Sequence, residues 1–299
     1  MDTTTTTTVP TPAARDFALL WIGIVSASVS AILIRYAEGA EPLALSFWRC
    51  AAGALVLLPF ARAGLGTLRP GAWRMPTVAG AFLAVHFATW ITSLELTTVA
   101  SSVLLVSTTP IFVALGAWLL LGEGAPARGW AGVIAAFAGT VLVAGGDLSG
   151  SSLDGNVLAL VGGATAGGYV LAGRRARQHT GILEYAVIAY AISAALLLIS
   201  CVVGGVELWG YDARTWWAIA GLIVGPQLLG HTFINLVLKD IDVTTVSVSI
   251  MAEPVIATVL AFLLFDEVPP VLLYPGGVAI LIGIYLTSTS RRRDLEAPS

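Results

Sequence analysis

Apolar segments follow one another along almost the whole chain, separated by short groups of Gly, Pro and charged residues. A helix of about 20 apolar residues spans the hydrocarbon core of a bilayer. The pattern predicts ten such spans, at residues 17–37, 42–62, 73–94, 98–121, 128–146, 154–173, 182–203, 214–238, 244–265 and 271–289. Each is predicted to be an α-helix, because lipid offers no hydrogen-bond partner to an open backbone. The connections are short, so no soluble domain is inserted between spans.

The composition supports a membrane protein. Hydrophobic residues make up 57% of the 299 residues, and Asp, Glu, Lys and Arg only 11%. Soluble proteins carry about 25% charged residues, so most of this surface must be solvated by lipid. Residues 1–16 form a Thr-rich segment that we expect to be a disordered tail, and residues 290–299 a basic tail. The expected fold is all-α and integral to the membrane.

The basic residues predict the orientation of the chain. Alternate ends of the ten spans collect twelve of the 15 Lys and Arg residues, namely Arg15, Arg62, Arg69, Arg74, Arg128, Arg174, Arg175, Arg177, Lys239, Arg291, Arg292 and Arg293. Cytoplasmic loops carry the excess of such residues. We therefore expect a multi-pass protein of the bacterial inner (plasma) membrane with both termini cytoplasmic.

An internal repeat relates the two halves of the chain. An offset of 144 residues places Pro110 on Pro254, Glu123 on Glu267, Pro126 on Pro270, Gly132 on Gly276 and Gly139 on Gly283. The repeat defines two five-helix units, 17–146 and 154–289. Because five is odd, the second unit enters the membrane in the opposite sense. Inverted repeats of this kind are typical of secondary transporters, whose halves exchange conformations around a central site.

The repeated segments resemble the EamA-type unit of the drug/metabolite transporter (DMT) superfamily. The resemblance is carried by Arg49, Leu94–Thr98, Ser101, Pro110, Glu123, Gly132 and Gly139, and again by Glu253, Pro254, Glu267, Gly276 and Gly283. It implies ten helices around a central cavity, with the fifth and tenth helices peripheral. Length and aromatic content are most similar to the bacterial aromatic amino acid exporters. The second half lacks a counterpart of Arg49, so its role is expected to be performed once.

Arg49 and Glu253 are the charges deepest in the hydrocarbon. Such charges are costly unless they are paired or face water, so they mark candidate substrate sites. In the functional interpretation Arg49 attracts a substrate carboxylate, and Glu253 an amino group or a proton. In the structural interpretation Arg49 caps helix carbonyls or pairs with a fixed partner.

Polar residues at helical spacing continue this candidate site. Gln227, His231 and Asn235 share one face of the eighth span, and Ser249 shares a face of the ninth span with Glu253. His86 and Trp90 do the same on the third span. We expect these faces to turn inward, although serines often serve only to join helices.

Aromatic and proline residues complete the candidates. Trp48, Trp90 and Tyr190 lie away from the membrane interfaces, where their rings either form flat walls for a planar substrate group or pack against helices. Pro110 and Pro254 are expected to bend the fourth and ninth spans and act as gates.

Several functional classes are excluded or disfavoured. The net charge of −3 with no basic block outside the C-terminal tail gives no nucleic-acid footprint. Cys50 and Cys201 lie in apolar stretches, so we expect neither a disulfide nor a metal site. No catalytic or nucleotide-binding motif appears, and we expect neither an enzyme nor a cofactor.

The sequence thus predicts a secondary transporter that exports small amphipathic metabolites by alternating access, with aromatic amino acids as the leading substrates. A carrier of another metabolite or of lipophilic drugs is the alternative. The expected partners are the small-molecule substrate and the lipid bilayer. The sequence does not determine the direction of transport or its coupling to protons. It does not determine the oligomeric state either, and a monomer is one of the alternatives.

Overall fold

The computed structural model describes residues 13–143, 152–265 and 271–296. Within these residues all regular structure is helical. In chain order the helices are α1 (Ala14–Ser28), α2 (Ser30–Tyr36), α3 (Pro42–Gly66), α4 (Arg74–Leu96), α5 (Val99–Val106), α6 (Thr109–Gly116), η1 (Ala117–Leu121), α7 (Ala127–Val143), α8 (Leu153–Arg177), α9 (Ile182–Gly204), α10 (Ala213–Leu222), η2 (Ile223–His231), α11 (Thr232–Val237), α12 (Val243–Ile250), α13 (Glu253–Phe265) and α14 (Leu273–Glu296).

These helices confirm the ten predicted spans. Among the described residues, nine continuous or nearly continuous helical stretches are long and apolar enough to cross a membrane. The shorter apolar helix α7 is the remaining span. Its predicted end at 146 lies outside the described residues. Helix α14 continues to Glu296, so it includes much of the segment 290–299 that the sequence marks as a basic tail.

Two of the spans are interrupted at repeat-related positions. The fourth span divides after Val106 and resumes at Thr109, and the ninth divides after Ile250 and resumes at Glu253. Both differences equal the 144-residue offset. The helices that precede the breaks are also capped alike, because the side chains of Thr98 and Asp242 accept hydrogen bonds from backbone N–H groups at the starts of α5 and α12.

Pro110 and Pro254 lie immediately after these breaks. Each is the second residue of its helix, α6 or α13. Proline fits the first turn, where its missing N–H has no intrahelical partner, whereas inside a helix it removes a backbone hydrogen bond and bends the helix. The prolines therefore follow short two-residue breaks in spans four and nine.

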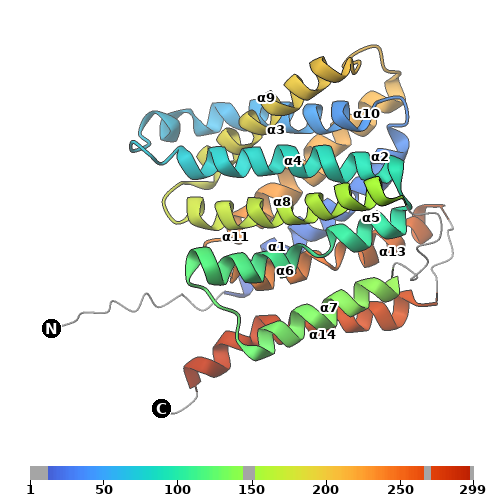
Figure 1. Ribbon diagram of the computed structural model, residues 1–299. Helices are drawn as coiled ribbons and strands as arrows, with labels where there is room; N and C mark the ends of the chain where they lie inside the picture. Colours follow the sequence, from blue (N-terminus) through green and yellow to red (C-terminus); the bar gives the residue numbers. More distant parts are fainter. Residues whose placement is uncertain (1–12, 144–151, 266–270, 297–299) are drawn as a thin grey trace.

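The helices pack in pairs that join the two halves. Helix α3 packs on α9, α4 on α8, α1 on η2, and α7 on α14. Figure 1 shows α7 and α14 side by side at one edge of the molecule, below α5 and α6. This places the fifth and tenth spans at the periphery, as the resemblance implied.

Four glycines allow α7 and α14 to approach closely. A Cβ added at Gly132 would lie 2.7 Å from the carbonyl oxygen of Gly283, and one at Gly139 would lie 2.5 Å from that of Gly276. The contacts are reciprocal, since a Cβ at Gly276 or Gly283 would meet the carbonyl oxygen of its partner at 2.7 or 2.6 Å. Small residues bring helices together in this way in membranes. Each contact maps onto the other under the repeat, which supports the inverted relationship of the halves.

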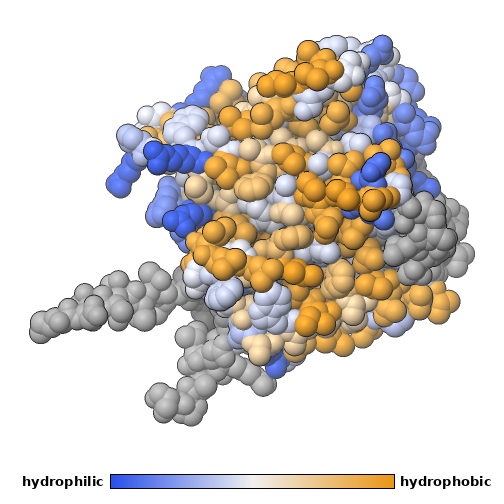
Figure 2. Space-filling view, viewed as in Figure 1, coloured by the Kyte–Doolittle hydropathy of each residue, from blue (hydrophilic) through white to orange (hydrophobic). Residues whose placement is uncertain are grey.

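The surface carries an apolar band. Figure 2 shows hydrophobic residues over the middle of the visible face and hydrophilic residues toward the ends of the helices. Large side chains such as Phe60, Trp118 and Leu119 are more than 60% exposed. Such exposure is unfavourable in water but expected of a surface that faces lipid.

Candidate functional site

Arg49 on α3 is the buried charge at the centre of the candidate site. Its exposed fraction is only 2%. Nε donates to Oε1 of Gln227 at 3.2 Å, and Nη1 lies 3.5 Å from the Ser30 hydroxyl. The guanidinium carbon lies 4.3 Å from the centre of the Phe87 ring. These neutral contacts hydrogen-bond the guanidinium without neutralising its charge.

Glu253 is the acidic candidate for compensating that charge. It is the first residue of α13, directly after the break in the ninth span, and α13 packs on α1 and α2, the helix that carries Ser30. No ion pair joins Glu253 to Arg49 within the part of the chain that the structure describes. Glu253 is also partly exposed. Arg49 therefore retains an unneutralised positive charge.

A π-helix positions the polar residues of the eighth span. The helix η2 contains Pro226, which has no N–H to donate, and it carries both Gln227 and His231. The backbone carbonyl of Gln227 accepts hydrogen bonds from Thr232 Oγ1 at 3.3 Å and from the Tyr190 hydroxyl at 3.4 Å. π-helical turns are frequent at functional sites, and this one holds Gln227 toward Arg49.

Aromatic rings extend from Arg49 along α4 and α8. His86 stacks on Trp90 with ring centroids 5.6 Å apart. The ring of Phe87 meets His231 edge-on at 5.4 Å, and Tyr169 meets His231 at 6.0 Å. The site therefore combines a buried cation with several flat rings, whose faces suit a planar apolar group.

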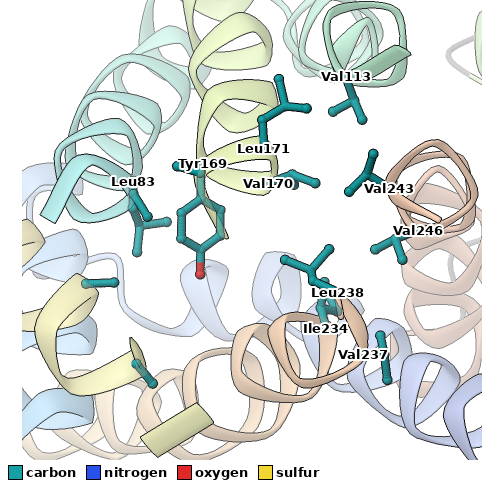
Figure 3. Close-up of a cluster of buried hydrophobic side chains, with 14 of the residues drawn as sticks. Leu83, Val113, Tyr169, Val170, Leu171, Ile234, Val237, Leu238, Val243 and Val246 are labelled. Carbon is teal, nitrogen blue, oxygen red and sulfur yellow. The ribbon is translucent and has the colours of Figure 1, made fainter. Parts of the chain in front are cut away.

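Asn235 lies at the far end of this group of residues. Its Nδ2 donates to the hydroxyl of Tyr169 and to the carbonyl of His231. Figure 3 shows the Tyr169 ring hanging from α8 between Leu83 and the segment that carries Ile234, with its hydroxyl directed into the protein interior.

Three polar atoms of the site are buried without a hydrogen-bond partner among the described residues: Nε1 of Trp90, Nε2 of Gln227 and Oδ1 of Asn235. Buried polar groups in native proteins nearly always have a partner, and each exception requires an explanation. Two donors and one acceptor thus have no partner, and the guanidinium of Arg49 is not neutralised. These features are typical of a binding site for a polar ligand.

The structure brings most of the predicted site residues together but gives three of them other contacts. Trp48 donates from Nε1 to the carbonyl of Leu208 at 2.9 Å and packs against Trp209 and Trp216. Ser249 donates to the carbonyl of Thr245 in its own helix at 2.7 Å. The Tyr190 hydroxyl donates to the backbone carbonyl of Gln227 and lies 3.1 Å from the hydroxyl of Thr232. These three residues therefore stabilise the segments that surround the site.

Phe87 was not among the residues that the sequence singled out. Phe87 is fully buried next to His86, and apolar residues of this kind carry no sequence signal of their own. The sequence does contain a signal for the π-helix, because Gly225 and Pro226 lie in the middle of a span, directly before Gln227.

Comparison with known proteins adds an independent observation. A family model described as the EamA-like transporter family matches residues 17–145 and again residues 153–289. The two matches together cover most of the chain and coincide with its two five-helix units.

Individual relatives agree with this match. An uncharacterized transporter of Archaeoglobus fulgidus is 26% identical over 265 residues, which is 85% of this chain and 90% of the relative. A pseudopaline exporter of Pseudomonas aeruginosa is 26% identical over 270 residues, 89% of this chain and 93% of the relative. A crystal structure described only as that of a protein shares the fold with a TM-score of 0.79 at 21% identity, over 95% of this chain and 99% of its own.

Proposed function

The chain belongs to the EamA-like transporter family, and from this premise we propose that it exports small amphipathic metabolites, most favourably amino acids with aromatic side chains. The membrane is the bacterial inner membrane, with both termini on the cytoplasmic side. Ten membrane-spanning helices and two matched halves support transport by alternating access.

The observation that carries this proposal is the unneutralised guanidinium of Arg49 with a free donor beside it. The Oε1 atom of Gln227 accepts from Arg49, which leaves its Nε2 without a partner. A substrate carboxylate that accepts from both groups would neutralise the charge and satisfy the donor. Arg49 and Gln227 therefore bind the carboxylate.

Glu253 binds the amino end of the substrate. It begins α13, which packs on α2, and Ser30 of α2 lies 3.5 Å from Arg49. No ion pair joins the two charges among the described residues. A zwitterionic amino acid placed between the two residues presents an opposite charge to each of them, so that the buried guanidinium is not left alone.

The rings of the site accommodate the side chain. His86, Phe87, Trp90 and His231 come from α4 and η2, which belong to different halves. The free Nε1 of Trp90 and the amide of Asn235 add polar contacts at the edges of these rings. A planar, partly polar side chain matches this surface.

The breaks at Pro110 and Pro254 are the hinges of the proposed movement. Each divides a span into two short helices at the same repeat position, and interrupted helices near the membrane midplane are typical of carriers that rock around a fixed site. We propose that α6 and α13 shift about these breaks when the carrier changes state.

A carrier of another metabolite is the alternative function. It is favoured by the relative that is named as a pseudopaline exporter. A lipophilic drug without charge fits the site less well, because it would leave Arg49 unneutralised.

Uptake into liposomes that contain the purified protein tests the proposal. A panel of labelled amino acids is offered with and without a pH gradient. Selective movement of Phe, Tyr or Trp that is lost in His86→Ala and Trp90→Ala is the expected result. Movement of no amino acid would overturn the aromatic amino acid assignment and favour the alternative.

A further inference from the structure

A second cluster of buried charge lies at the face of the membrane where α1 begins and α14 ends. Arg174 near the end of α8 donates from Nη1 to the carbonyl of Leu238 at 2.6 Å. Its Nε and Nη2 both lie 3.1 Å from Oε1 of Glu123. The side chains of Arg174 and Glu123 are only 4% and 15% exposed. This is an interior contact rather than a surface ion pair, whose effect would be small.

Both partners of Arg174, Glu123 and the Leu238 carbonyl, lie at the ends of membrane spans. The fourth span ends at Gly122, whose φ of +68° is the left-handed conformation that favours glycine. The next N–H, that of Glu123, closes the helix by donating to the carbonyl of Ala117 at 2.9 Å. Leu238 follows directly after α11. Arg174 therefore joins the ends of the fourth and eighth spans, which belong to different halves.

Arg177 connects the same cluster to the candidate site. Its Nε donates to the carbonyl of Asn235 at 3.2 Å, and its Nη1 donates to the carbonyl of Thr180. The side chain of Asn235 contacts Tyr169 in the site. One residue of α11 thus contacts the site through its side chain and the charge cluster through its backbone.

An apolar cluster includes Tyr169 of the site and Leu238, whose carbonyl Arg174 contacts. Figure 3 shows it converging from α6, α8, α12 and the end of α11: Val113, Val170, Leu171, Leu238, Val243 and Val246. All of these side chains are buried, with exposed fractions of 8% or less. A polar substrate cannot cross this packed layer, so this face is closed in the state described.

We propose that Arg174, Glu123 and the Leu238 carbonyl form the latch that keeps this face of the carrier closed and that breaks in each transport cycle. The inference rests on the proposed alternating access. The pair is suited to breaking, because one oxygen of Glu123 takes both contacts and Oε2 has no partner among the described residues. A two-oxygen, bidentate pair would be stronger. The latch residues act on the position of the helices and do not touch the substrate.

Access to a cysteine in the apolar cluster tests the latch. Val246→Cys is introduced after Cys50 and Cys201 are replaced by serine, and a charged, membrane-impermeant methanethiosulfonate is applied from the face where α1 begins. We expect slow labelling in this parent. Glu123→Gln should accelerate labelling about tenfold or more, the equivalent of one charge-assisted hydrogen bond. Arg174→Lys, which cannot hold both partners, should also accelerate it.

The matched control is Lys239→Gln. Lys239 forms an ion pair with Asp240 near the same face, but that pair is 3.7 Å long and its lysine is 50% exposed. Its loss should leave labelling unchanged. If Glu123→Gln fails to fold, the double variant Glu123→Gln with Arg174→Gln removes both charges and leaves none buried alone. Unchanged labelling in whichever variant folds would overturn the latch. The assay uses no substrate, so its outcome is independent of the amino acid assignment.

Discussion

The Nε atom of Arg49 lies 3.2 Å from Oε1 of Gln227, and this contact joins α3 of the first half to η2 of the second. It places the cation of the site at the boundary between the units that must move relative to one another. A substrate held by both residues therefore contacts both halves at once, which is what alternating access requires of a central site.

Replacing Arg49 by Gln should weaken binding of the carboxylate. The loss of charge-assisted hydrogen bonds worth about 1.5–3 kcal/mol predicts affinity about tenfold to a hundredfold lower. Arg49→Lys should also be impaired, since a single ammonium cannot contact Gln227 and the substrate with the planar geometry of guanidinium. Equilibrium binding of labelled substrate to the purified protein measures both effects.

The control for this series is Arg69→Lys, because Arg69 is an exposed residue in the loop between α3 and α4. It should bind as the wild type does. Full affinity in Arg49→Gln would assign Arg49 a structural role only.

Substitutions of Trp90 and Trp48 should have different effects on substrate selectivity. Trp90→Phe removes the unpartnered Nε1 next to His86 and should change the ranking of aromatic substrates. Trp48→Phe removes a hydrogen bond to Leu208 and should instead lower stability by about 1 kcal/mol. Competition by a panel of aromatic amino acids, together with thermal melting in detergent, distinguishes them. Equal shifts in selectivity would place Trp48 in the site, as the sequence suggested.

Pro254→Ala should slow turnover more than it weakens binding. Alanine restores an N–H and allows α12 and α13 to merge into one helix, which removes the proposed hinge. The comparison is Pro59→Ala, since Pro59 lies within the continuous helix α3 and has no break to repair. Turnover and affinity are measured separately in liposomes. Unchanged turnover in Pro254→Ala would remove the gating role.

Gly132→Ala should destabilise the pair of peripheral helices. The added Cβ would lie 2.7 Å from the Gly283 carbonyl oxygen and equally near Thr287, and overpacking of this kind costs about 1–3 kcal/mol. Gly277→Ala on the same α14 is the matched control, because its nearest atom outside the local helix would be 3.6 Å away. The melting temperature should fall in Gly132→Ala alone. Equal melting temperatures in the two variants would mean that α7 and α14 can move apart without a loss of stability.

The lengths of the apolar segments were sufficient to predict the spans, and proline, glutamate and glycine residues at one offset were sufficient to predict the repeat. Lipid imposes helical structure on any long apolar segment, so few alternatives exist, and glycines and prolines at a constant offset locate the equivalent helices. The sequence did not predict that Pro110 and Pro254 each follow a two-residue break between helices. The breaks depend on how the short helices are capped and packed, which a local pattern does not contain.

The site was harder to predict than the fold. Polar residues such as Gln227 and His231 are conspicuous within an apolar span, whereas Phe87 resembles any core residue until Arg49 is found 4.3 Å from its ring centre. Arg174 was counted only as one of the basic residues that indicate orientation. Its burial against Glu123 is a tertiary contact between spans that are distant in sequence.

The central claim, that Arg49 and Gln227 hold a substrate carboxylate, is tested most directly by competition against labelled phenylalanine in liposomes that contain the protein. The competitors are 3-phenylpropionate, which lacks the amino group, and 2-phenylethylamine, which lacks the carboxylate. We predict that 3-phenylpropionate competes with the wild type and loses that effect in Arg49→Gln, while 2-phenylethylamine competes poorly with both. Competition by 2-phenylethylamine alone, unaffected by Arg49→Gln, would contradict the account.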